Sequence, residues 1–197
     1  MENAPQARPS FTLLCAAWFA LVAVAAIGRL WQPAVNVTPL AAAAIAAGGV
    51  FANPLVAATV PLAALAVSNL VLPGYGLGGG IAMALVVHAA FAWPVLLGGC
   101  VAAIRGEGRR WPAVVGSALA SSLVFFVVTN FAHWCLTDDY PHTSAGLLSC
   151  YAAGLPFYRW MPVGDVVWSL AMVGGLAACG VLGSARRPVS SLPAKAA

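Results

Sequence analysis

The sequence predicts an all-α, polytopic membrane protein whose chain crosses a lipid bilayer six times. Two features of the composition support this class, because 62% of the residues are hydrophobic and only 7% are charged. Soluble globular domains carry about 25% charged residues, so this chain lacks the polar surface that water would require. A third feature is its apolar stretches, several of which reach the ~20 residues that a helix needs to cross hydrocarbon.

The apolar stretches divide the chain into spans. A helix rises about 1.5 Å per residue through about 30 Å of hydrocarbon. The six predicted spans are residues 11–30, 39–51, 54–72, 81–104, 111–131 and 161–183. The second is short, so it either takes in residues 35–38 or stops within the protein. A helix over 144–155 is too short to span, and we expect it as an extra element in the outer loop between the fifth and sixth spans.

Turn signals and tails complete the domain organisation. Asn53-Pro54 is a turn signal, residues 73–80 form a glycine-rich loop, and residues 105–110 form a charged connector. Residues 1–10 are expected as a cytoplasmic N-terminal tail and residues 11–183 as the six-helix transmembrane domain. Residues 184–197 are small, polar and basic, which predicts a disordered cytoplasmic C-terminal tail.

The basic residues predict the orientation. Seven of the nine fall on one side of the six-span topology, and that side is expected to be the cytoplasm: Arg8, Arg105, Arg109, Arg110, Arg186, Arg187 and Lys195. Both termini are then cytoplasmic. The net charge of +4 is explained by this topology, so we do not expect a nucleic-acid partner.

Polar side chains gather near the opposite, outer face. Polar groups are costly in hydrocarbon, so they usually face a cavity or each other. Asparagines would orient the polar edges of a ligand, aromatic rings would stack on it, and Arg29 would meet an anion. We select eight candidate substrate-binding residues: Arg29, Asn36, Asn69, Asn130, His133, Trp134, Tyr140 and Tyr151.

Several of these residues have structural alternatives. Asn69 and Asn130 would equally serve to satisfy backbone groups at helix ends, and Arg29 would equally extend to lipid headgroups. Asp165 enters the last span near its start, where it complements the helix dipole or pairs with Arg159. His88 lies deep in the fourth span, as a functional group or as an imidazole bonded to a carbonyl.

Known catalytic and metal motifs are absent from the sequence. It has no glycine-rich phosphate loop ending in Lys-Ser or Lys-Thr, no Gly-x-Ser-x-Gly and no His-Glu-x-x-His. The five cysteines lack the Cys-x-x-Cys spacing of metal sites, although Cys135 and Cys150 both fall on the outer side, as a disulfide or as free thiols. We therefore expect no enzyme activity, no catalytic or metal-binding residues and no cofactor.

Longer motifs resemble one family. Residues 129–134 (TNFAHW), 140–147 (YPHTSAGL), 150–151 (CY), 155–158 (LPFY) and 164–165 (GD) resemble the carboxy-terminal pattern of DUF6580-like proteins, a family of uncharacterised bacterial membrane proteins. Arg29, Asn36-Val37-Thr38-Pro39 and Ser68-Asn69 resemble its amino-terminal pattern, which often has Ser-Asp at the last pair. The family has been grouped with the substrate-binding S components of energy-coupling-factor (ECF) vitamin transporters.

This resemblance implies a six-helix bundle with an outward-facing pocket, located in the bacterial cytoplasmic (inner) membrane. It also implies a small-molecule ligand, an ECF-type transmembrane coupling protein and cytoplasmic ATPases as partners. We expect a substrate-binding subunit for uptake of a small, vitamin-like nutrient. One alternative is a non-transport scaffold similar to cell-shape membrane proteins, and another is a membrane enzyme using His133 with Asp138 or Asp139.

Overall fold

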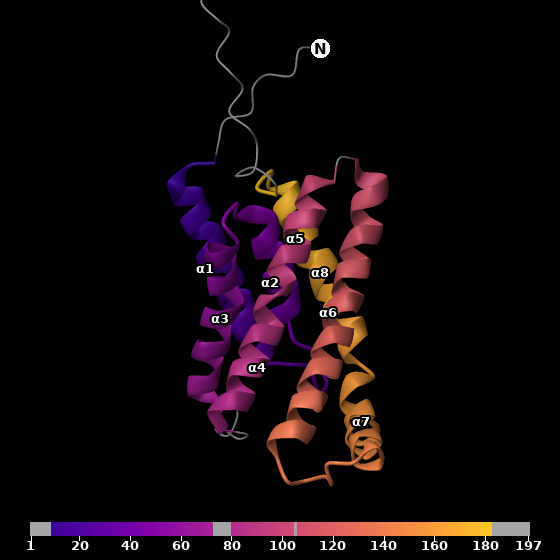
Figure 1. Ribbon diagram of the computed structural model, residues 1–197. Helices are drawn as coiled ribbons and strands as arrows, with labels where there is room; N and C mark the ends of the chain where they lie inside the picture. Colours follow the sequence, from indigo (N-terminus) through magenta and orange to yellow (C-terminus); the bar gives the residue numbers. More distant parts are fainter. Residues whose placement is uncertain (1–8, 73–79, 105, 183–197) are drawn as a thin grey trace, which may run out of the picture.

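The computed structural model describes residues 9–72, 80–104 and 106–182, and within them the regular structure is entirely helical. The glycine-rich loop, Arg105 and most of both predicted tails lie outside the described residues. The helices are α1 (Phe11–Leu30), α2 (Leu40–Val50), α3 (Pro54–Val71), α4 (Gly80–Ala92), α5 (Pro94–Ala103), α6 (Glu107–Leu136), α7 (Ser144–Tyr158) and α8 (Met161–Ala178). Figure 1 shows the long helices side by side, with the start of α1 and the end of α8 at the same end of the bundle.

Five helices are long and apolar enough to cross a membrane. They are α1, α3, the combined stretch Gly80–Ala103, α6 and α8. The combined stretch consists of α4 and α5, which are separated by Trp93, and α5 begins at Pro94. Proline lacks the N–H that continues a helix, so it breaks or kinks one. This architecture supports a multi-pass membrane protein.

The second predicted span differs from the structure. α2 has 11 residues, which corresponds to about 16 Å of helix, so it does not cross about 30 Å of hydrocarbon by itself. Every residue of α2 is buried, and the helix lies in the centre of the bundle (Figure 1). α2 is therefore enclosed by the other helices, and whether residues 35–38 complete a crossing together with it stays a prediction.

Close backbone packing explains how α2 is buried. A Cβ atom on Gly48 would lie 1.9 Å from the carbonyl oxygen of Val95 in α5, and one on Gly98 would lie 1.9 Å from that of Ile45 in α2. Two glycines on facing helices therefore allow the two backbones to touch. Small residues permit this kind of approach in membranes, where no hydrophobic drive brings helices together.

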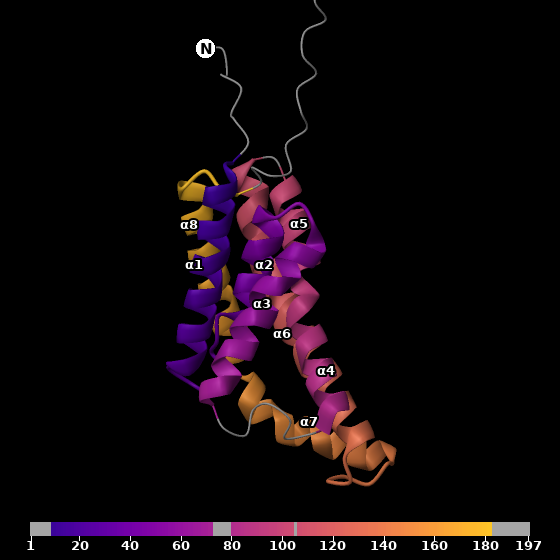
Figure 2. The same ribbon diagram turned by 90° about the vertical axis from the view of Figure 1, so that its left-hand side faces the viewer.

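The fifth span is longer than the sequence predicted. α6 has 30 residues, about 45 Å, and includes part of the expected charged connector at one end and His133 at the other. This length exceeds the hydrocarbon thickness, so polar residues at the helix ends project beyond it. The expected short helix is confirmed as α7, which extends to Tyr158 and lies obliquely at the end of the bundle opposite the start of α1 (Figure 2).

Local signals define the ends of these helices. The Asn53 side chain accepts a hydrogen bond of 2.9 Å from the Leu55 backbone N–H, which confirms the predicted turn. The Thr143 hydroxyl accepts one of 3.2 Å from the Gly146 N–H and begins α7.

Candidate functional site

A cavity of about 220 Å³ lies between the helices. Its wall combines polar groups from the segment that joins α1 to α2 with apolar and aromatic groups from the surrounding helices. The lining residues are Arg29, Gln32, Asn36, Thr38, Leu40, Leu65, Asn69, Leu72, Met83, Ala84, Val87, His88, Phe91, Phe125 and Met161. We call this space the main cavity.

Arg29 forms a polar part of the wall. It lies in the last turn of α1, where a cation complements the helix dipole, and its side chain is only 7% exposed. Its Nη1 donates hydrogen bonds to Ser68 Oγ and, at 2.8 Å, to Asn69 Oδ1. The Ser68 hydroxyl in turn donates to the carbonyl of Ala64 at 2.8 Å. Arg29 is therefore held inside the bundle and does not extend to lipid headgroups.

Asn36 holds the connecting segment in an uncommon conformation. Its φ of 62° is left-handed, a region that asparagine tolerates better than most non-glycine residues. The Asn36 backbone N–H donates to Gln32 Oε1 at 3.1 Å, and its side-chain Nδ2 donates to the carbonyl of Phe157 at 3.1 Å. Asn36 therefore ties the wall of the main cavity to α7.

A second cavity of about 210 Å³ adjoins the first. Asn36, Phe125 and Met161 line both cavities. The others that line the second are Phe126, Thr129, Asn130, Gly154, Phe157 and Tyr158. Asn130 lies inside α6 and its Nδ2 donates to the carbonyl of Phe126 at 2.8 Å, so its amide is bonded within its own helix.

His88 contributes a fixed imidazole to the main cavity. Its Nδ1 lies 2.6 Å from the carbonyl oxygen of Ala84, one helical turn earlier. A carbonyl oxygen only accepts, so Nδ1 carries the proton and a neutral ring keeps Nε2 as an acceptor. The structure shows the carbonyl-bonded alternative for His88, and the ring also lines the main cavity.

Four of the eight predicted site residues lie elsewhere, in a corner formed by α6, the following loop and α7. They are His133, Trp134, Tyr140 and Tyr151, and none of them lines either cavity. Trp134 Nε1 donates to the carbonyl of Pro141 at 3.0 Å, and the Tyr151 hydroxyl donates to that of Val127 at 2.9 Å. These contacts hold the loop between α6 and α7, and α7 itself, against α6.

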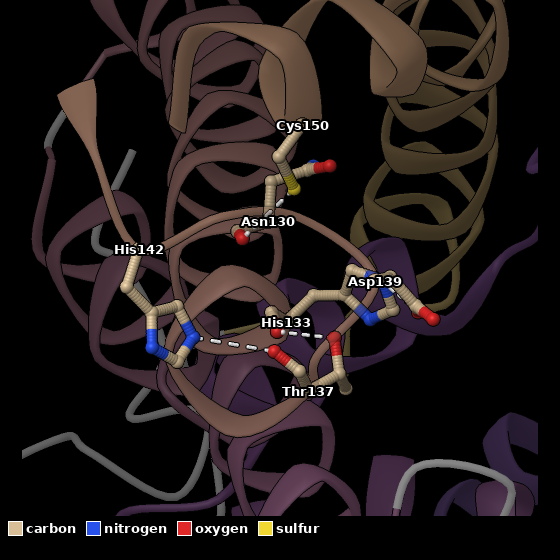
Figure 3. Close-up of polar contacts among 6 residues, drawn as sticks. All are labelled: Asn130, His133, Thr137, Asp139, His142 and Cys150. Atoms are coloured by element: carbon tan, nitrogen blue, oxygen red, sulfur yellow. Dashed lines mark hydrogen bonds and ion pairs between the residues drawn. The ribbon is translucent and has the colours of Figure 1, made fainter. Parts of the chain in front are cut away.

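Figure 3 shows the polar contacts of this corner. His133 Nε2 lies 3.0 Å from Asp139 Oδ2, and the His133 ring meets that of Tyr140 with centroids 6.2 Å apart. The ring of His142 reaches back to α6, with Nε2 3.3 Å from the carbonyl oxygen of Thr137.

The sequence matches a family of unknown function, DUF6580, over residues 9–187. The chain belongs to this family. No curated protein and no solved structure matches it.

Several residues that line the cavities of this DUF6580 protein were not among the predicted site residues. Gln32 and Thr38 gave a weak signal, because they flank Asn36 in the polar connection. The apolar lining residues gave none, because an aromatic or methionine in a spanning helix is usually a packing residue. Phe91 and Phe125 nevertheless form a paired wall of the main cavity, with ring centroids 4.5 Å apart.

The cysteines of the DUF6580 chain are free. Cys135 is exposed, while Cys150 is buried and its Sγ donates to the carbonyl of Asn130 at 3.4 Å (Figure 3). Burial raises the pKa of the Cys150 thiol and also raises the pKa of the Tyr151 hydroxyl. Within the described ranges, His, Cys, Asp and Glu side chains form no group of three that could hold a metal ion.

The suggested ion pair between Arg159 and Asp165 is not present. Arg159 is exposed and its guanidinium lies 5.4 Å from the centroid of the Trp160 ring, a cation–π contact. Asp165 is instead buried inside the bundle, with 2% of its side chain exposed. The two side chains differ because α7 ends at Tyr158, so Arg159 turns outward before α8 begins at Met161.

Proposed function

We propose that this protein is a substrate-binding membrane subunit for the uptake of a small nutrient, and that a separate partner supplies the energy. The observation that carries the proposal is the main cavity, in which a buried arginine, two asparagines and a histidine meet an aromatic wall. Ligand sites in proteins combine mostly apolar walls with a few precisely placed polar groups.

The size of the cavity favours a small ligand. An engineered protein cavity of about 150 Å³ holds benzene, and the main cavity measures about 220 Å³. A molecule somewhat larger than benzene would fit, with more room if it extends past Asn36 into the second cavity.

The chemistry of the lining favours a ligand with a polar, acidic end and a flat or apolar body. Arg29 and Asn69 would bind an acidic group, since a guanidinium donates in a fork that matches carboxylates and phosphates. Phe91 and Phe125 would contact the apolar body. His88 Nε2 would accept a hydrogen bond from the ligand.

The energy source would be another protein. The sequence has no phosphate loop, so we propose an arrangement similar to ECF transporters, in which an S component binds the nutrient while a membrane coupling protein and ATPases drive uptake. Under this proposal the protein lies in a bacterial inner membrane with both termini in the cytoplasm, which the seven basic residues on one predicted side support.

A membrane enzyme is a second candidate, because His133 Nε2 and Asp139 Oδ2 are within the reach that general acid–base catalysis needs, at 3.0 Å. The pair is 37% and 65% exposed and lines neither cavity, so neither cavity would hold a substrate against it. We therefore favour the binding function. A hydrolytic or transfer activity lost in Asp139→Asn and retained in Asp138→Asn would reverse that order.

The experiment that tests uptake is a mild-detergent purification of the tagged full chain from its own membranes, with identification of co-purifying proteins. The proposal predicts a transmembrane coupling protein with ATPase subunits, and nutrient accumulation by cells that depends on ATP. Co-purification of the cell-wall machinery, with no accumulation of any nutrient, would favour the scaffold function instead.

A further inference from the structure

Asp165 is an acidic side chain enclosed in the membrane domain. It lies in the second turn of α8 and is 2% exposed. Among the described residues, its Oδ2 atom has no hydrogen-bond partner. Ser169 lies one helical turn further along the same face and is fully buried. Its hydroxyl also has no hydrogen-bond partner among the residues that the structure describes. Asp165 and Ser169 therefore form a small polar site inside an otherwise apolar interface.

A third member of this site comes from α6, which packs against α8. The side chain of Ser122 lies beside the Asp165 carboxyl where the two helices pack together. Ser122 is fully buried and also donates to the carbonyl of Ala118 at 3.0 Å, one turn earlier in α6. Hydroxyl groups donate and accept, so Ser122 and Ser169 are suited to a carboxyl group in either protonation state.

No described cation neutralises Asp165. It is the one ionisable residue of α8, α2 has none, and α6 has none between Arg110 and His133. The connecting segment 31–39 that covers α8 also has none. The groups of the packed elements and nearby ends that do ionise are Cys150, Tyr151 and Tyr158 on α7, Arg159, which lies against Trp160, and Arg29, which is bonded to Ser68 and Asn69.

An ionised carboxylate is strongly disfavoured in such a place, unless it binds a proton or a cation. Calcium and magnesium take six or more oxygen ligands, and no group of three acidic, histidine or cysteine side chains occurs in the described ranges. A proton requires no additional room and turns one carboxyl oxygen into a donor. We propose that Asp165, with Ser122 and Ser169, forms a proton-binding site in which the carboxyl group is kept neutral.

The site lies about one helical turn along α8 from a residue that lines both cavities. Met161, which lines both, is four residues before Asp165, a separation of about 6 Å along the helix. A Cβ atom on Gly164 would lie 2.8 Å from Cγ1 of Val37, so the segment that carries Asn36 packs on the α8 backbone beside Asp165. The bound proton therefore stabilises the contact between α8, α6 and the cavity wall, because a carboxylate there would draw in water.

Infrared spectroscopy of the purified full-length protein tests the proposal without any ligand. The chain has only five acidic residues, so the C=O stretching band of a protonated carboxyl group is readily assigned. At neutral pH we expect this band in the wild-type protein, with a shift in D₂O, and we expect its loss in Asp165→Asn. Asp138→Asn is the matched control, because Asp138 is exposed and lies outside the buried site, so this substitution should leave the band unchanged. Absence of the band from the wild-type protein would overturn the proposal.

Thermal unfolding at several pH values gives a second readout. The unfolded chain's carboxyl ionises above about pH 4, so unfolding releases a proton from Asp165 and stability falls as the pH rises. Relative to Asp165→Asn, the wild-type protein should lose stability as the pH rises above about 5, with a slope of about one proton. An equal dependence of stability on pH in the wild type and Asp165→Asn would contradict a proton site. Stabilisation of the wild type alone by sodium would also contradict it. These measurements need no substrate, so their failure is distinct from failure of the proposed uptake function.

Discussion

Arg29 Nη1 donates a 2.8 Å hydrogen bond to Asn69 Oδ1, and this contact joins the ends of α1 and α3 at the wall of the main cavity. Because asparagine is neutral, its amide oxygen orients the guanidinium and leaves the positive charge in place. The contact is thus a structural support and also sets the charge that a ligand would meet.

Substitutions at Asn69 test the structural role of this contact. Asn69→Leu should lower the free energy of unfolding by about 1.5–3 kcal/mol, because a hydrogen bond to a charged group is lost at a buried arginine. Asn69→Asp is the matched control, which keeps an acceptor oxygen at the same place and should retain wild-type stability. Thermal unfolding in detergent measures both. Equal stability of Asn69→Leu and the wild type would show that the bond contributes nothing.

The glycines between α2 and α5 make a sharper packing prediction. Gly48→Ala and Gly98→Ala each place a methyl group 1.9 Å from a backbone carbonyl oxygen, so the two helices must separate. We expect each to lower stability by at least about 2 kcal/mol, the scale of overpacking in a core. Gly116→Ala in α6 is the control, because its Cβ meets nothing within 4 Å. A similar melting temperature for all three variants would contradict the described α2–α5 contact.

Sequence patterns predicted the long helices well, because about 20 consecutive apolar residues have few alternatives to a membrane span. The length of α2 was harder, since an alanine-rich segment is equally apolar whether it spans or is enclosed by other helices. Whether the segment spans or is enclosed depends on contacts between residues far apart in the sequence, such as Gly48 and Val95.

The candidate site was predicted only in part for a similar reason. Arg29, Asn36 and Asn69 line the main cavity and Asn130 lines the second. The sequence showed that polar residues gather at one end, but it did not show that α6 extends to Leu136 and carries His133 and Trp134 away from the cavities. The sequence pattern did not predict that Phe125 lines the cavities, because this depends on the helix face that the residue occupies.

Thiol labelling tests the packing of α7 against the end of α6. In variants that each keep one cysteine, Cys135 should react with a maleimide and Cys150 should react much more slowly, because it is buried. Burial raises the pKa of the Cys150 thiol, so its reactive thiolate fraction is smaller at a given pH and its labelling should rise only at more alkaline pH. In the wild-type protein, a requirement for reduction before either thiol reacts would indicate a disulfide and contradict the structure.

The topology is testable with cysteines introduced into a cysteine-free chain. Gly108 is the second residue of α6, and the exposed His142 lies in the loop between α6 and α7. Figure 1 shows the start of α6 and this loop at opposite ends of the bundle. A membrane-impermeant maleimide added to spheroplasts should label His142→Cys, and it should label Gly108→Cys only after the membrane is opened. Labelling of both positions from one side would contradict the predicted crossing of α6.

Native mass spectrometry of the protein from its own membranes shows whether the main cavity holds a small ligand. We expect a retained small molecule that is lost in Arg29→Gln and in Asn36→Leu, two substitutions in the cavity wall. Trp134→Phe is the matched control, because Trp134 lies outside both cavities and should keep the molecule. An empty wild-type protein that also binds nothing from a cell extract, or a ligand lost in Trp134→Phe and kept in the two cavity variants, would contradict the account.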